Sequence, residues 1–214
     1  ITGHGTDTIK IEGVDDLHGA THSVISDRIE AGTFAIAAAM TDGDLTLHYP
    51  RGHNLDALLM VLRETGATVT ESDNAIRIVA NGRPVAADIT TDPFPGFPTD
   101  LQAQFMAMMC IADGSSRISE TIFENRFMHV PELLRMGADI QVDGGIAMVR
   151  GRDALSPAPV MATDLRASVS LVLAALTVAG TSQISRIYHL DRGYSKLEEK
   201  LGKCGATLQR VKAA

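Results

Sequence analysis

The stretch Thr163-Asp164-Leu165-Arg166-Ala167-Ser168 has a counterpart at Thr99-Asp100-Leu101-Gln102-Ala103-Gln104 and a looser one at Ser26-Asp27-Arg28-Ile29-Glu30-Ala31. Each places a hydroxyl residue and an aspartate immediately before an apolar run, a pattern typical of a helix start. The three aspartates are 73 and 64 residues apart along the chain. Repetition at this spacing predicts three copies of one structural unit.

The same order of elements is predicted in each copy. A short strand leads into the helix that begins at the repeated stretch, and a second strand, a second helix and two closing strands follow, which makes a β-α-β-α-β-β unit. A Gly-Ala dipeptide, at Gly66, Gly137 and Gly205, ends the second helix of each copy. The copies are expected at about 21–82, 83–151 and 152–214, with residues 1–20 as the tail of a preceding domain.

The third copy is one strand short. We expect residues 21–25 to be the first strand of the first copy, and Thr207–Val211 to be a closing strand of the third. A strand with an unpaired edge is normally avoided. We therefore predict that a segment N-terminal to Ile1 supplies the missing strand, with Ile9–Val14 as a less favoured alternative. A chain that begins with Ile rather than Met is expected to be a piece of a longer protein.

The first helix of each copy lacks a polar face, which indicates that it is buried. The second helices carry charged residues and are expected outside. The fold prediction is therefore α/β, with three buried central helices inside a shell of strands and amphipathic helices. The apolar runs of the first helices are Phe34–Met40, Phe105–Ile111 and Leu171–Leu176.

Composition narrows the function classes. The net charge is −7 and the arginines are scattered, which argues against nucleic-acid binding. No apolar run approaches the ~20 residues of a membrane-spanning helix, and no secretory leader is visible. Cys110 and Cys204 form neither a disulfide framework nor a metal-binding spacing, so a reducing cytoplasm is the simplest location. No His-Glu-x-x-His or Cys-x-x-Cys pattern occurs, so metal catalysis is unsupported and no cofactor is expected.

The repeated helix starts are candidate binding groups. Helix N-termini carry unpaired N–H groups and attract anions. Arg126 and Arg192 follow the middle strands of the second and third copies, and Arg51 takes a similar place in the first. Arg126, Arg166 and Arg192 together predict a site for a phosphate or carboxylate, which guanidinium groups bind in pairs of hydrogen bonds.

Asp100 or Asp164 near such a site could act as a general base. Simpler interpretations remain open for all of these residues. Repeats copy helix-capping aspartates for structural reasons, and loop arginines are usually solvated.

Four motifs resemble the UDP-N-acetylglucosamine 1-carboxyvinyltransferase family: Phe97–Gln104, Glu124–Leu133, Ala162–Ser168 and Asp191–Tyr194. The resemblance implies an inside-out α/β barrel of the enolpyruvyl transferase type, with two domains of three β-α-β-α-β-β units. The chain is similar to the C-terminal half. Members of the family transfer enolpyruvyl from phosphoenolpyruvate to the 3-hydroxyl of UDP-N-acetylglucosamine and release phosphate, the first committed step of peptidoglycan synthesis.

Roles for single residues follow from this resemblance alone. Asp100 matches the carboxylate that binds the sugar hydroxyl and accepts its proton, and Ile122 matches a backbone contact to the nucleotide-sugar. Asp164 matches a carboxylate in proton transfer at the phosphoenolpyruvate methylene. The residues that match phosphoenolpyruvate ligands are Arg126, Arg166 and Arg192, and Arg192 also matches a residue that moves when the domains close.

The family's catalytic lysine, asparagine and cysteine belong to a part that this chain lacks. The chain alone is therefore expected to be inactive, with the missing N-terminal domain as its partner. Two alternatives stay open: a non-catalytic nucleotide-sugar-binding module of the same fold, and an enzyme like 5-enolpyruvylshikimate-3-phosphate synthase. The sequence also leaves open a homodimer formed through the uncovered inner face.

Overall fold

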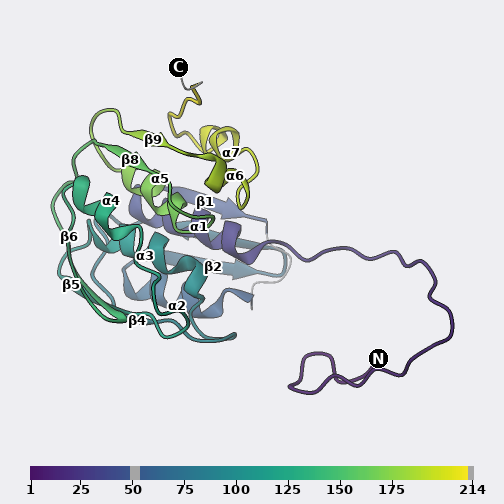
Figure 1. Ribbon diagram of the computed structural model, residues 1–214. Helices are drawn as coiled ribbons and strands as arrows, with labels where there is room; N and C mark the ends of the chain where they lie inside the picture. The colour runs from purple at the N-terminus through teal and green to yellow at the C-terminus, as the bar shows by residue number, and fades with distance from the viewer. Residues whose placement is uncertain (49–53, 212–214) are drawn as a thin grey trace.

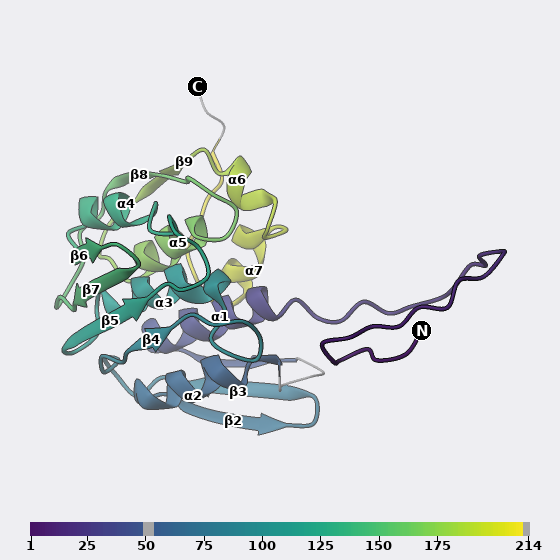
Figure 2. The ribbon, with the colours of Figure 1, turned by 60° about the horizontal axis from the view of Figure 1, so that its bottom comes forward.

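Three separate sheets surround a layer of buried helices in the computed structural model, which describes residues 1–48 and 54–211 (Figure 1). The expected inner helices are present, and the sheets do not join into a closed barrel. Residues 1–27 run away from this body in both views, and within 1–20 the single bridge is Thr2 to Lys10 (Figures 1 and 2). The inner helices are α1 (Arg28–Met40), α3 (Gln102–Met109) and α5 (Ser168–Leu176).

The first unit is an antiparallel sheet with helices on one face. Its strand order is β1-β3-β2, so the last closing strand lies in the centre. Ile76 and Ile78 are buried against the helices, while Arg77 between them is exposed. This alternation is what a half-buried strand requires. The elements are β1 (Asp44–Leu47), α2 (Asp56–Glu64), β2 (Thr68–Ser72) and β3 (Ala75–Val79).

The second unit is the most complete of the three. Its order is β4-β5-β7-β6, with β4 and β5 parallel and the rest antiparallel. The last closing strand is again central. The elements are β4 (Ile89–Thr90), the 3₁₀ turn η2 (Thr99–Leu101), β5 (Ser115–Ser119), α4 (Val130–Arg135), β6 (Asp139–Asp143) and β7 (Ile146–Arg150).

The third unit has only the parallel pair β8-β9. The predicted strand at Thr207–Val211 is not formed, and neither is the one at residues 21–25. Both predictions were wrong because a strand exists only with a hydrogen-bonded neighbour, and none of the described residues provides one. The elements are β8 (Pro159–Met161), β9 (Gln183–Ser185), α6 (Tyr188–Asp191) and α7 (Leu197–Lys203).

The helix starts differ in detail from the prediction. Asp27, rather than Ser26, is the N-cap of α1, and its carboxylate accepts from the amides of Ile29 and Glu30. Thr99 lies within η2 instead of capping a helix. In the third unit a turn precedes α5, which begins at Ser168 instead of Asp164.

Close packing around the inner helices leads to a prediction about Gly151. A Cβ placed there would lie 1.7 Å from the carbonyl oxygen of Ala112, in the segment that follows α3. Backbone cannot move aside as a side chain does, so Gly151→Ala should lower the free energy of unfolding by at least about 2 kcal/mol. Denaturant unfolding measures the change.

Gly202 is the matched control. It lies in α7 with no atom within 4 Å of the added Cβ. Gly202→Ala should therefore stabilise the chain by up to about 1 kcal/mol through helix propensity. Equal effects of the two substitutions would contradict the packing described here.

Candidate functional site

Asp100 and Arg126 form an ion pair at the start of the second inner helix. Asp100 lies in η2, Arg126 lies in the loop between β5 and α4, and Nη2 to Oδ1 measures 2.5 Å. The guanidinium carbon of Arg126 stands 4.7 Å from the centre of the Phe123 ring, a cation–π contact. The Asp100 side chain is 38% exposed, so its carboxylate is still open to solvent.

Arg166 lies at the start of the third inner helix and points toward the start of the first. Its Nη2 is 3.4 Å from Oδ2 of Asp27, and its Nη1 donates to the carbonyl of Gly193 at 3.2 Å. Burial alone would lower the pKa of Arg166, but the nearby Asp27, Tyr194 and Asp100 raise it overall. Arg166 therefore stays charged beside the Asp100–Arg126 pair.

A buried polar network beneath these charges joins α1, α3 and the segment after α6. Tyr194 Oη lies 2.9 Å from Thr33 Oγ1 on α1, and Gln104 Nε2 on α3 donates to Tyr194 Oη at 3.2 Å. The same Nε2 donates to the carbonyl of Asp100 at 2.9 Å. The Tyr194 ring carries the Arg166 guanidinium 5.5 Å from its centre. Burial raises the pKa of Tyr194, so its hydroxyl stays protonated and available for these bonds.

Asp164 has a clear structural role. Its Oδ1 accepts from the amides of Arg166 and Ala167, at 2.7 and 2.5 Å. Ser168 Oγ accepts from the amides of Thr163 and Asp164, at 3.0 Å each. Asp164 thus shapes the turn that presents Arg166, in line with the structural interpretation left open by the sequence.

Arg192 and Arg51 differ from the other two arginines. Arg192 is exposed at the C-terminal end of α6, one residue before the Gly193 carbonyl that holds Arg166. Among the described residues its side chain has no ion-pair partner. Arg51 falls outside the residues that the structure describes. The structure therefore brings Asp100, Arg126 and Arg166 together and leaves Arg192 at their edge.

Ile122 follows β5 in a loop held by Glu120. The Ile122 amide donates to Oε1 of Glu120 at 2.9 Å. With the N–H occupied in this way, the carbonyl is the backbone group of Ile122 that can meet a ligand. Thr99 Oγ1 donates to Oε2 of the same carboxylate at 2.8 Å.

Three residues of this site were not predicted as site residues: Asp27, Tyr194 and Glu120. Asp27 was identified only as a helix start, yet Arg166 reaches it from 139 residues away. Its equivalent position in the repeat was a usable signal. Nothing in the sequence pattern points to a hydrogen bond of Tyr194 or Glu120.

The arrangement suits an anion that is held by arginines beside a carboxylate base. Both inward guanidinium groups are satisfied by carboxylates that are partly exposed, so an arriving phosphate or carboxylate can take over those hydrogen bonds. No group of three metal-ligating side chains occurs among residues 1–48 and 54–211. Burial raises the pKa of Cys110 to about 12, so this thiol belongs to the core.

His129 is a second buried group beside the site. Its side chain is fully buried, and neither ring nitrogen has a hydrogen-bond partner among the described residues. Burial, together with the charge of Arg126, lowers its pKa to about 3. The imidazole is therefore neutral in the folded protein at any ordinary pH.

Stability should consequently fall in acid. Between the ordinary histidine pKa of about 6.5 and the folded value of about 3, the unfolded chain binds a proton at this position that the folded chain does not. The free energy of unfolding should drop by about 1.4 kcal/mol for each pH unit across that window, in addition to changes from other groups.

Urea unfolding from pH 7.5 to 4 tests this contribution. Glutamine does not titrate, so the free energy of unfolding of His129→Gln should lack the contribution of about 1.4 kcal/mol per pH unit. His22→Gln, at an exposed position, is the control and should keep the slope of the unaltered chain. Equal slopes for His129→Gln and His22→Gln would show that His129 is not held neutral.

Comparisons with known proteins show the family of the chain. The family model described as EPSP synthase (3-phosphoshikimate 1-carboxyvinyltransferase) matches residues 1–201. The enolpyruvyl transferase NikO from Streptomyces tendae superposes with a TM-score of 0.79 at 30% identity, over 86% of this chain and 44% of that one. EPSP synthase from Acinetobacter baumannii gives 0.60 at 17% identity, over 76% and 39%, which supports the fold alone.

The chain belongs to the EPSP synthase family of enolpyruvyl transferases. Within that family, curated relatives at about 60% identity are UDP-N-acetylglucosamine 1-carboxyvinyltransferases, as the sequence resemblance indicated. The one from Afipia carboxidovorans is 61% identical over 99% of this chain and 49% of its own length, and the one from Caulobacter vibrioides is 62% identical over 99% and 50%. The chain thus spans about half the length of these relatives, consistent with the expected C-terminal half.

Proposed function

We propose that the chain forms one wall of the active site of an enzyme that transfers enolpyruvyl from phosphoenolpyruvate to the 3-hydroxyl of UDP-N-acetylglucosamine. The observation that carries this proposal is the meeting of the Asp100–Arg126 pair with Arg166 at adjacent starts of buried helices. The names of the relatives at about 60% identity supply the nucleotide-sugar. The reaction would be the first committed step of peptidoglycan synthesis, in the cytoplasm.

Each side chain then has a task in the reaction. Asp100 accepts the proton of the sugar hydroxyl as its oxygen bonds to C2 of phosphoenolpyruvate. Arg126 and Arg166, joined by Arg192 when the site closes, hold the phosphate and carboxylate groups. Asp164 takes part in adding a proton to the methylene carbon in the first step and in removing one in the second, when the C–H electron pair re-forms the double bond as the C–O bond to phosphate breaks.

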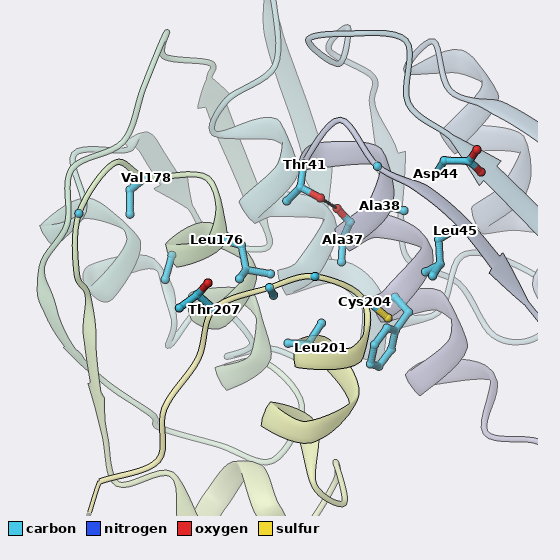
Figure 3. A pocket seen from close by; sticks show the side chains of 16 residues that line it. Ala37, Ala38, Thr41, Asp44, Leu45, Leu176, Val178, Leu201, Cys204 and Thr207 are labelled. Carbon is cyan, nitrogen blue, oxygen red and sulfur yellow. Dashed lines mark hydrogen bonds between the residues drawn. The ribbon is translucent and has the colours of Figure 1, made fainter.

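The remaining half of the enzyme is the natural partner of this chain. A pocket of about 460 Å³ opens between the ends of α1 and α5 and the segment after α7 (Figure 3). Thr41, Leu176 and Cys204 are among its lining residues. In the first two units the last closing strand occupies the sheet centre, and the third unit has no such strand beside β9. A strand from the missing N-terminal part would pair with β9 and cover this pocket, which lies at the opposite end of α1 from Asp27.

The first test is turnover. The chain alone should release no phosphate from phosphoenolpyruvate and UDP-N-acetylglucosamine, because the other wall of the site is missing. Adding a polypeptide with the half of the Caulobacter vibrioides relative that this chain does not match should restore phosphate release. Robust turnover by the chain alone, or none by the mixture despite complex formation, would overturn the proposal.

Substitutions in the complemented enzyme test the roles. Asp100→Asn removes the base and should lower kcat by roughly 10²–10⁴-fold, and Arg192→Ala should raise KM for phosphoenolpyruvate. Arg77→Ala is the control, since Arg77 pairs with Asp44 on the exposed face of the first sheet. It should leave both constants unchanged.

The same assay separates the alternatives. A non-catalytic module would bind UDP-N-acetylglucosamine in calorimetry without releasing phosphate, and Arg192→Ala would change nothing. An enzyme like 5-enolpyruvylshikimate-3-phosphate synthase would release phosphate with shikimate 3-phosphate as acceptor instead of the nucleotide-sugar.

A further inference from the structure

Glu120 is a buried carboxylate without a cationic partner. Its residue is 6% exposed, it lies directly after β5, and it forms no salt bridge with any described residue. Removing a carboxylate from water is costly unless hydrogen bonds replace the lost hydration. A buried carboxylate therefore needs hydrogen-bond donors, and the positions of these donors show which segments Glu120 holds together.

Four donors surround this carboxylate. Oε1 accepts from Thr91 Oγ1 at 3.0 Å and from the amides of Ile122 and Phe123 at 2.9 and 3.2 Å. Oε2 accepts from Thr99 Oγ1 at 2.8 Å. The donors come from three separate segments: the end of β4, the turn η2, and the loop that leads to α4.

These segments carry both members of the central ion pair. Thr99 immediately precedes Asp100, so the Oε2 bond holds the turn on which the carboxylate is mounted. The Phe123 amide is fixed by Oε1, and the Phe123 ring lies against the Arg126 guanidinium. One side chain therefore links the turn that carries Asp100 to the loop that carries Arg126.

We propose that Glu120 is a positioning residue for the Asp100–Arg126 pair and for the backbone of Ile122. It touches no substrate; it aligns the base, the arginine and the Ile122 carbonyl. The kinetic part of this inference rests on the proposed function, whereas the structural part does not. The bonding pattern also predicts which substitution is tolerated.

A glutamine can reproduce the pattern. Its Oε1 can accept the two amides and the Thr91 hydroxyl, and its Nε2 can donate to Thr99 Oγ1, since a hydroxyl both donates and accepts. Glu120→Ala removes all four bonds. Thr99→Val, which is close in shape, removes only the bond to Oε2.

Two measurements test the proposal on folded protein, with circular dichroism confirming equal folded fractions. The first is amide hydrogen exchange of the chain. Glu120→Ala should raise exchange of the Ile122 and Phe123 amides at least tenfold, while Glu120→Gln should stay within about threefold. The second is kcat/KM of the complemented enzyme, expected to fall at least tenfold in Glu120→Ala, to fall less in Thr99→Val, and to be largely kept in Glu120→Gln.

The outcomes separate this proposal from the proposed function. Unchanged exchange at Ile122 and Phe123 in Glu120→Ala would overturn it, as would kcat/KM within twofold of the unaltered enzyme or a Glu120→Gln variant as impaired as the alanine one. If Glu120→Ala does not fold, Thr99→Val with a loss of kcat/KM at full folded fraction supports the proposal, and no loss overturns it. If the unaltered complemented enzyme shows no turnover, the proposed function fails, and the exchange measurement alone decides whether Glu120 positions the loop.

Discussion

The burial of three helices without a polar face is the constraint on which the rest of the structure depends. Helices α1, α3 and α5 can expose polar groups only at their ends, because nearly every side chain along them is enclosed. A helix start leaves N–H groups unpaired and carries partial positive charge. Asp27 caps α1, and Asp164 accepts from two amides of the turn that precedes α5. Arg166 pairs with Asp27, and Arg126 pairs with Asp100. The buried helices therefore account for this cluster of charged residues, whether or not it binds a ligand.

The polar network beneath the cluster explains why the three starts keep one arrangement. Thr33, Gln104 and Tyr194 are buried, and Thr33 Oγ1, Gln104 Nε2 and Tyr194 Oη lie within hydrogen-bond distance of one another. Their mutual hydrogen bonds are satisfied only when α1, α3 and the segment after α6 lie at fixed distances. Arg166 rests on the Tyr194 ring, and Gln104 holds the carbonyl of Asp100. Fold and site thus share the same few hydrogen bonds.

The sequence was a good guide wherever the signal is local. Runs of apolar residues located the inner helices, and the Gly-Ala dipeptides located the ends of the second helices. The sequence was misleading at Thr99 and Thr163, where it predicted helix N-caps. A hydroxyl residue before an aspartate is typical of an N-cap, but here a short turn comes before each helix. The sequence failed for residues 21–25 and Thr207–Val211, because a strand is defined by a partner that the pattern of one segment does not contain. The contact of Glu120 with Thr99 is long-range, and no spacing rule could reveal it. The contact of Arg166 with Asp27 is also long-range, but the repeat marks Asp27 as the equivalent of Asp100 and Asp164.

The two sides of the candidate site differ in how far the chain itself supports them. Asp100, Arg126 and Glu120 all belong to the second unit, whose four-stranded sheet is complete. Arg166 instead depends on Gly193 and Tyr194, in the third unit, where the sheet has only two strands. Arg210 lies in Thr207–Val211, the stretch that forms no strand. It stabilises the segment that holds Arg166 by pairing with Asp191 and Glu198 on either side of that segment. The Asp100 side of the site therefore rests on a four-stranded sheet, whereas the Arg166 side rests on a two-stranded pair and on the ion pairs of Arg210. The contacts of Arg166 with Gly193, Asp27 and Tyr194 form without any further strand beside β9.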